Sequence, residues 1–492
     1  MKLTEIKSLF CSKKVFQLIL LFLVYTVAFM VMISKYQFDF DAIIYMYSTQ
    51  KIVFPPYINT GHPVFFYINW LFFHALKYLG INIVLYSKLF AYISSSLLIL
   101  FTLLFIDEYR KYYNITKPKV SLLISGLFLL SIPYFLYHFT LYQTNILSIS
   151  FVLVALILYF RHLRDKKSNF AKYLFPVFLS LAIGTHLNTI FIFLPIAVHY
   201  LYINLRNISK GYSSPKELLF NILLIITMFL FSTFLIYLIP FIYLNYNFQK
   251  LYSFAFSSSN NIFFKINFLN NLKYFIIIMF FMGFTFPLGL YGVIKHNKNI
   301  FAYAFLGLAL MVIFIFSTTL ISSTCRQLLL ISIIFSVFIL ANSFISEKTL
   351  LFLAFVSFLT FIPFKVMFIN KDIVVKEMNN LIETKITSKK ATICTDEVTL
   401  YPYLLVYQDN IHNILLCSDK KNFYKAKRVG CFLSNEKVFT ENSFFLSGKT
   451  KPYNLLRRAS LSYKLDNLFS KLGLKANSWV SDLFLYKGAV AK

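Results

Sequence analysis

Long apolar runs alternate with short polar segments along the first three quarters of the chain. Between Val15 and Ile369 these runs reach about 18 residues or more, which as an α-helix spans about 30 Å of hydrocarbon. The pattern therefore predicts a polytopic α-helical membrane protein. Single crossings are expected at about 15–34, 83–106, 120–138, 145–160, 218–243, 273–294, 300–320, 327–345 and 349–369.

One further apolar stretch, at about 173–203, is longer than one crossing needs and has basic residues on both sides. These flanking residues are Lys166, Lys167 and Lys172 before it and Arg206, Lys210 and Lys216 after it. Because basic loops stay on the cytoplasmic side, both flanks belong there, so the stretch must cross twice. The polar break "GTHLN" at 184–188 predicts the bend, and the chain then has about eleven crossings in all.

The basic residues also predict the orientation. Lys13 and Lys14 place the N-terminus inside, so the first crossing delivers a first outer loop at 35–82. An odd number of crossings then places residues 370–492 outside. We expect a multi-pass protein of the plasma (inner) membrane, whose transmembrane domain covers 1–369 and whose active site faces the extracytoplasmic side.

The segment 370–492 differs in kind from the rest. It combines strand-like pieces, "ATICTDE" and "NILLC", with helical patterns such as "NLLRRASLSYKLDNLFSKLG". This mixture predicts a small extracytoplasmic α/β domain, and about 120 residues suffice to bury a core. The formal net charge of +29 does not indicate nucleic-acid binding, because the basic residues cluster in the short segments between apolar runs.

Two acids stand out in the first outer loop. Of the 19 acidic residues, only Asp39 and Asp41 fall on the predicted outer side of the transmembrane domain. They precede "AIIYMYSTQKIV", an amphipathic segment suited to lying in the membrane interface. A turn at His62-Pro63 and the aromatic segment "VFFYINWLFFHALKYLGI" follow.

This order of features resembles the C-type (GT-C) glycosyltransferases that use polyprenyl-phosphate sugars. Relatives include protein O-mannosyltransferases and the aminoarabinose transferase that acts on lipid A. Two later segments add to the resemblance: "LAIGTHLNTIFIFLP", with His186 where a Lys is common, and "STCRQLLLISIIFSVFIL", which aligns Arg326 with a family Arg. The chain departs from the family at Gln327, at the single Pro after His62, and at Gln143 and Asn145, where many relatives carry a second acid.

The resemblance implies a GT-C-like fold and an enzyme that transfers a sugar from a polyprenyl-phosphate donor. The acceptor would be an extracytoplasmic glycan, lipid or protein. Asp41 or Asp39 would be the catalytic base. Arg326, His62, His186 and Asn145 would bind the substrate, and a guanidinium suits phosphate because it binds two oxygens at once. No residue is assigned to a metal, and a divalent metal is left open, because the second acid is replaced.

Each of these residues also has an ordinary structural explanation. Asp39 or Asp41 can cap a helix, and Arg326 can anchor a helix end at the interface. His186 can be a hydrogen-bonded core residue, and His62 can shape the turn.

Two alternative functions stay open. A lipid-glycan flippase or transporter would need polar groups along several spans and internal repeats, and neither is evident. An O-antigen ligase or polymerase would concentrate Arg and His in one large outer loop, whereas the loop at 244–272 has neither.

Overall fold

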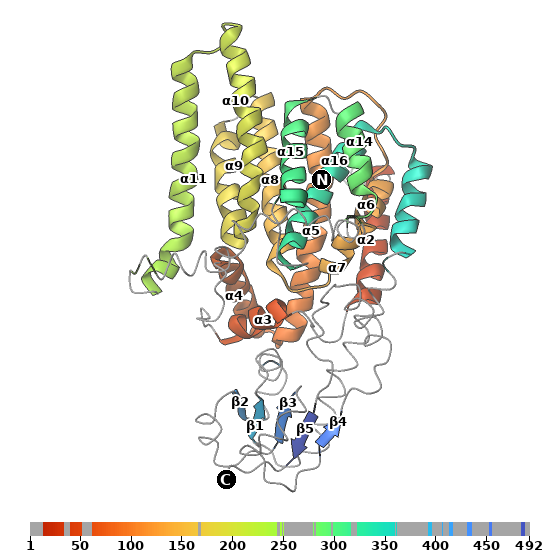
Figure 1. The fold of residues 1–492 in the computed structure, drawn as a ribbon, viewed down its shortest axis with the longest axis vertical. Coiled ribbons are helices and arrows are strands. Elements are labelled where there is room, and N and C mark those ends of the chain that lie inside the picture. The colour runs from red at the N-terminus through yellow and green to blue at the C-terminus, as the bar shows by residue number, and fades with distance from the viewer. Residues whose placement is uncertain are drawn as a thin grey trace, which may run out of the picture. The chain divides into compact units, whose positions relative to one another are not determined.

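The computed structural model describes residues 13–33, 40–51, 62–165, 169–243, 282–296, 299–315 and 322–359, five strands between 392 and 487, and a few single residues. The chain forms two compact units, each described here by itself (Figure 1). The first contains Met1–Met32, Phe54–Ile81 and Lys88–Phe361. The second contains Ile33–Val53, Asn82–Ser87 and Ile362–Lys492.

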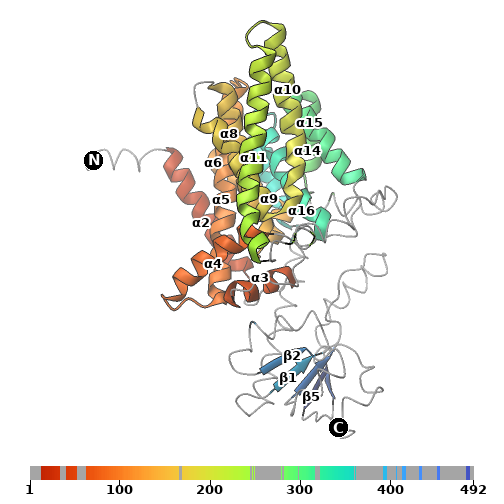
Figure 2. The ribbon, with the colours of Figure 1, turned by 90° about the vertical axis from the view of Figure 1, so that its left-hand side faces the viewer.

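The first unit is a bundle of helices (Figures 1 and 2). Its described helices are α2 (Lys13–Met32), α4 (Pro63–Lys77), α5 (Ile83–Tyr112, in this unit from Lys88), α6 (Leu122–Leu130), α7 (Pro133–His138), α8 (Thr144–Arg164), α9 (Asn169–Thr185), α10 (Phe193–Ser209), α11 (Pro215–Tyr243), α14 (Thr285–Lys295), α15 (Ile300–Leu310) and α16 (Ser322–Asn342). A 3-10 helix, η1 (Leu187–Ile192), precedes α10, and a π-helical turn, η2 (Met311–Ile315), follows α15. Residues 347–359 are also helical.

Five of the described helices are long and apolar enough to cross a membrane. They are Lys14–Met32, Ile83–Tyr112, Thr144–Arg164, Thr189–Ser209 and Pro215–Ile242. Helices satisfy their backbone hydrogen bonds internally, as a lipid environment demands. The helical, multi-pass nature of the chain is thereby confirmed. The count of about eleven crossings stays a prediction, because the expected crossings at 273–294 and 349–369 extend beyond the described residues.

The predicted bend at 184–188 is confirmed. Helix α9 ends at Thr185, and α10 begins at Phe193 after the 3-10 helix. Helix α10 then runs back beside α8, where the Tyr159 hydroxyl lies 2.9 Å from Nδ1 of His199 (Figure 1). The apolar stretch is therefore two helices joined by a short connection, as its two basic flanks require.

The stretch at 120–138 differs from the single crossing expected. It forms two short helices, α6 and α7, with a break at Ser131 and Ile132. Pro133 causes the break, because proline lacks an N–H and its ring pushes the preceding residue out of the helical region. Ile132 accordingly has φ −62° and ψ 117°.

Close packing at Gly184 sets the position of α4. A Cβ atom at this residue of α9 would lie 2.7 Å from Cγ2 of Val64 in α4 and 2.7 Å from Cγ2 of Ile236 in α11. Small residues allow helices in membranes to approach in this way. The Tyr67 hydroxyl of α4 also donates a hydrogen bond of 2.9 Å to the Ile236 carbonyl. The start of α4 is therefore held against the ends of α9 and α11.

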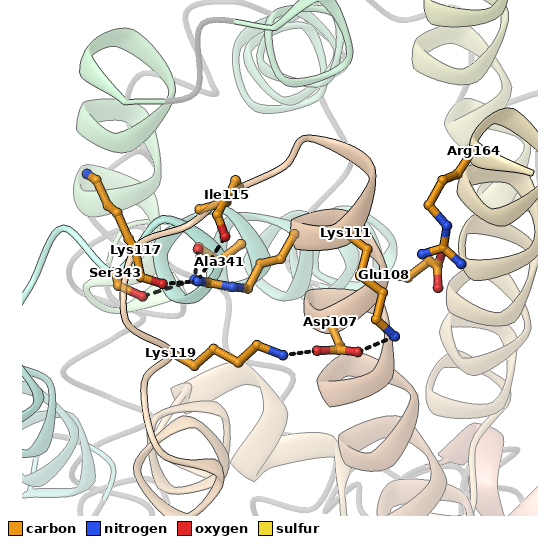
Figure 3. Close-up of polar contacts among 10 residues, drawn as sticks. Asp107, Glu108, Lys111, Ile115, Lys117, Lys119, Arg164, Ala341 and Ser343 are labelled. Carbon is orange, nitrogen blue, oxygen red and sulfur yellow. Dashed lines mark hydrogen bonds and ion pairs between the residues drawn. The ribbon is translucent and has the colours of Figure 1, made fainter.

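Charged side chains gather at the opposite end of the helical unit (Figure 3). The buried carboxylate of Glu108 lies 2.7 Å from Nη1 of Arg164, which joins α5 to α8. Asp107 pairs with Lys111 at 2.6 Å and with Lys119. Burial makes the pair at Glu108 sensitive to loss of either partner, whereas the exposed pairs of Asp107 contribute little to stability.

Arg110 joins α5 to the C-terminal end of α16 at the same place. Its buried guanidinium donates hydrogen bonds to the carbonyl of Ala341 and, at 3.3 Å, to the hydroxyl of Ser343. It also donates to the carbonyl oxygens of Ile115, at 3.2 Å, and Lys117. Terminal carbonyls of a helix lack partners within it, so Arg110 satisfies groups that burial would otherwise leave unpaired.

The second unit contains helix α3 (Phe40–Lys51) and a mixed sheet. The strands are β1 (Thr392–Thr395), β2 (Asn413–Leu416), β3 (Cys431–Ser434), β4 (Pro452–Asn454) and β5 (Phe484–Lys487), in the order β2-β1-β3-β5-β4. β1 pairs in parallel with β2 and β3, and β5 pairs antiparallel with β3 and β4. β1 and β2 lie in the two segments predicted to be strand-like, whereas the other three strands lie outside them. Parallel pairs need crossover connections, commonly helices, but these lie outside the described residues, so the α/β domain stays a prediction.

Candidate functional site

Two histidines that the sequence singles out meet at one end of the helical unit. His62 is the N-cap residue of α4, directly before Pro63, and His186 follows the last residue of α9. Their ring centroids are 5.1 Å apart and the rings are inclined by 31°. Both side chains are buried, with 3% and 5% of their surfaces exposed. The structure therefore brings these two candidate residues together.

The local backbone explains why His186 lies where it does. Its N–H bonds to the Ala182 carbonyl at 2.8 Å, as in a continuing helix. Its own carbonyl then accepts two bonds from Thr189, from the backbone N–H at 3.0 Å and from the hydroxyl at 2.7 Å. These bonds close the turn into the 3-10 helix. The absence of a side chain at Gly184 gives α4 the space to bring His62 alongside.

A second polar group lies where α7 leads into α8. The side chains of His138, Gln143 and Asn145 are all buried. Nδ1 of His138 lies 2.6 Å from Oε1 of Gln143, and Nδ2 of Asn145 donates a 3.3 Å hydrogen bond to the same oxygen. We call these three residues the amide cluster. Asn145 is a predicted binding residue, and the structure places it in the first turn of α8.

The amide cluster lies at the same end of the bundle as the histidine pair. Ser148, one turn after Asn145, donates a 3.2 Å hydrogen bond to the Ala182 carbonyl, which also accepts from the N–H of His186. Three aromatic rings make a second connection, with centroid distances of 5.3 to 5.5 Å: these are Phe65 of α4, Phe90 of α5 and Tyr142 beside Gln143. The two clusters therefore belong to one region.

The other three candidates are Asp41, Asp39 and Arg326, whose side chains lie outside the described part of the structure. Asp41 lies in the first turn of α3, within the second unit, and its side chain is outside the described part of the structure. Asp39 lies outside the described residues. Arg326 lies in the first turns of α16, and its side chain is likewise not described. Their roles stay predictions.

Sequence reasoning missed His138 and treated Gln143 only as the replacement of an acid. The signal was the concentration of polar residues in "YHFTLYQTN", 137–145, between two apolar runs. A polar segment at the end of a buried helix has to be hydrogen-bonded, and that requirement could have identified the cluster. For a metal, the described residues contain no group of three or more His, Cys, Asp and Glu side chains placed to hold one.

Comparison with known proteins identifies the fold of the chain. No family model and no curated protein sequence matches the chain. The crystal structure of ArnT from Cupriavidus metallidurans in the apo state matches with a TM-score of 0.58 and 11% identity, over 96% of this chain and 98% of that one. ArnT from Cupriavidus metallidurans bound to undecaprenyl phosphate matches with a TM-score of 0.56 and 11% identity, over 95% and 97%. The chain therefore has the GT-C fold of ArnT, as the order of its sequence motifs predicts.

Proposed function

We propose that the protein is an integral membrane glycosyltransferase that takes its sugar from a polyprenyl-phosphate donor. The observation that carries the proposal is the likeness to ArnT over 96% of the chain. One of the two matching ArnT structures has undecaprenyl phosphate bound. The buried pair His62 and His186 supports the proposal independently. A fold alone does not fix a reaction, so the proposal rests on the two together.

The reaction has a simple balance of bonds. A hydroxyl of the acceptor attacks the anomeric carbon of the sugar, and the bond from that carbon to the phosphate oxygen breaks. The lipid phosphate leaves with the bonding electrons, and the hydroxyl proton passes to a carboxylate. Asp41 is the preferred base and Asp39 the other candidate. By the family resemblance, the product is inverted at the anomeric carbon.

The leaving phosphate needs fixed donors where its negative charge develops. Arg326 would bind two phosphate oxygens, and His62 and His186 would each donate one N–H. Two rings 5.1 Å apart can face the same anion. Asn145 would contact the sugar. The acceptor is a cell-envelope glycan, lipid or protein at the extracytoplasmic face of the inner membrane, and the role of a divalent metal is open.

The test uses the purified full chain in lipid nanodiscs. Undecaprenyl-phosphate-linked pentoses and hexoses serve as donors, and cell-envelope extract supplies acceptors. Release of undecaprenyl phosphate is followed by mass spectrometry. The parent protein should consume at least one donor. His62→Ala should lower the rate roughly 10- to 100-fold, because it removes a hydrogen bond to a charged group.

His74→Ala is the matched control, because His74 lies on the same helix three turns from His62, where Nδ1 is 2.8 Å from the Trp70 carbonyl. It should keep the parent rate. A protein that releases no undecaprenyl phosphate with any acceptor in nanodiscs, but carries lipid-linked sugar between the leaflets of sealed liposomes, would be a flippase, and the transferase proposal would be wrong.

A further inference from the structure

The side chain of Gln143 does not make the hydrogen bond that is usual at its position in a helix. Gln143 is the N-cap residue of α8, with φ −138° and ψ 160°, but its side chain makes no capping hydrogen bond. It is 4% exposed, and its neighbours His138 and Asn145 are each 3% exposed. Polar groups buried among apolar and aromatic side chains must be hydrogen-bonded to be tolerated. The amide of Gln143 is therefore committed to the amide cluster rather than to the helix end.

The two hydrogen bonds that Gln143 accepts fix the orientation of the Asn145 amide. Oε1 of Gln143 accepts from Nδ1 of His138 at 2.6 Å and from Nδ2 of Asn145 at 3.3 Å. An amide oxygen has two lone pairs, so both are now occupied. Because the nitrogen of Asn145 faces Gln143, its oxygen faces the other way.

The oxygen of Asn145 is the atom that this arrangement leaves over. Oδ1 is buried and accepts no hydrogen bond from the part of the chain that the structure describes. Proteins rarely bury an acceptor without a donor unless a ligand or water provides one. The neighbouring Ser148 connects this turn of α8 to the carbonyl that also bonds His186, so the oxygen lies at the end of the bundle where the histidine pair lies.

We infer that Oδ1 of Asn145 accepts a hydrogen bond from a hydroxyl of the transferred sugar, and that Gln143 is the positioning residue that aims it. The inference rests on the proposed function and deepens it by assigning sugar recognition to a neutral acceptor. An uncharged amide oxygen complements a hydroxyl, whereas an ammonium group is bound more strongly by a carboxylate. The substrate class is therefore a neutral sugar that carries a hydroxyl opposite Asn145.

The experiment measures binding to the full chain in nanodiscs without acceptor. The probes are bare undecaprenyl phosphate, an undecaprenyl-phosphate-linked hexose, and its analogues with each hydroxyl replaced in turn by hydrogen or by fluorine. Fluorine is unable to donate a hydrogen bond. At one ring position both analogues should bind roughly 10- to 100-fold more weakly than the parent hexose, because each leaves Oδ1 without a donor.

The variants separate a loss of sugar recognition from a loss of the folded state. Asn145→Ala should bind the parent hexose and the analogues of that position equally, and Gln143→Met should reduce the discrimination as well. Both should bind bare undecaprenyl phosphate like the parent protein, which reports that the fold is intact. Ser150→Ala is the matched control, since its hydroxyl bonds only to the Ile146 carbonyl, at 2.8 Å, among the contacts described. It should leave the discrimination unchanged.

Three results would overturn the inference. Fluorine tolerated at every ring position would mean that no hydroxyl donates to Oδ1, and that water alone fills the site. If Asn145→Ala still bound the parent hexose more tightly than the analogues, another residue would recognise the hydroxyl. A parent protein that binds neither bare undecaprenyl phosphate nor any linked sugar would overturn the proposed function, and this inference with it.

Discussion

Asp41 is the second residue of helix α3, and Asp39 directly precedes that helix. The N-terminus of a helix carries a partial positive charge, which stabilises a nearby carboxylate. The backbone of Asp41 belongs to the first turn of α3, and a base needs such a fixed starting point if it is to reach one hydroxyl proton. Residues two apart in an extended segment share a face, but at a helix start they diverge, so only one of the pair should meet the acceptor.

Asp41→Asn should lower the transfer rate roughly 10²- to 10⁴-fold, because the amide keeps the shape of the side chain but cannot take a proton. Binding of undecaprenyl phosphate should be unchanged. Asp39→Asn should have a milder effect. The measurement is the initial rate of undecaprenyl phosphate release from one defined donor. If both variants transfer sugar at the parent rate, the two acids are ordinary helix-capping residues and the base lies elsewhere.

At the scale of the elements, the candidate region depends on how closely α4, α9 and α11 approach. Gly184 occupies the crossing point, where Val64 and Ile236 would each lie 2.7 Å from an added Cβ. Gly307 in α15 offers a contrast, because an added Cβ there would meet nothing within 4 Å. The two glycines therefore separate the effect of packing from the effect of helix propensity.

Gly184→Ala should destabilise the protein by about 1–3 kcal/mol, the usual cost of overpacking, and should move the start of α4 with His62. Gly307→Ala should stabilise its helix by roughly 0.5–1 kcal/mol, since alanine loses less backbone entropy than glycine. The measurement is thermal unfolding in detergent together with donor binding. A Gly184→Ala protein as stable and as tight-binding as the parent would show that α4 does not depend on this contact.

The elements themselves were largely predictable from the periodicity and length of apolar runs. Helix α2 corresponds to the first apolar run, and α3 corresponds to the short segment at 42–53. The connection between α9 and α10 corresponds to the break at 184–188. The break at Pro133 was not predicted, because the apolar character continues through it and only the missing N–H interrupts the helix. The polar segment 137–145 could have been recognised from the sequence, but the contacts within the amide cluster could not, for another reason. A hydrogen bond between His138 and Gln143 depends on how α7 meets α8, which no pattern along the chain specifies.

At the scale of the whole molecule, the helical unit is asymmetric in charge. The end that carries Glu108, Arg110 and Arg164 also holds the turn between α10 and α11, with Lys210 and Lys216 beside it. The opposite end holds the histidine pair and the amide cluster. Basic residues near helix ends favour the cytoplasmic side, so this asymmetry predicts the sidedness of the site.

Reporters active on only one side of the membrane test that orientation. A reporter inserted at Tyr212, an exposed residue of the α10–α11 turn, should report the cytoplasm. A reporter fused after residue 380 should report the outside, because about eleven crossings precede it. An outside signal at 212 would reverse the bundle and move the histidine pair to the cytoplasmic face. If the reporters at 212 and at 380 both gave a cytoplasmic signal, the site would still lie outside. The number of crossings between 244 and 369 would then be one fewer than predicted. The first outcome would contradict an extracytoplasmic acceptor, whereas the second would correct only the count.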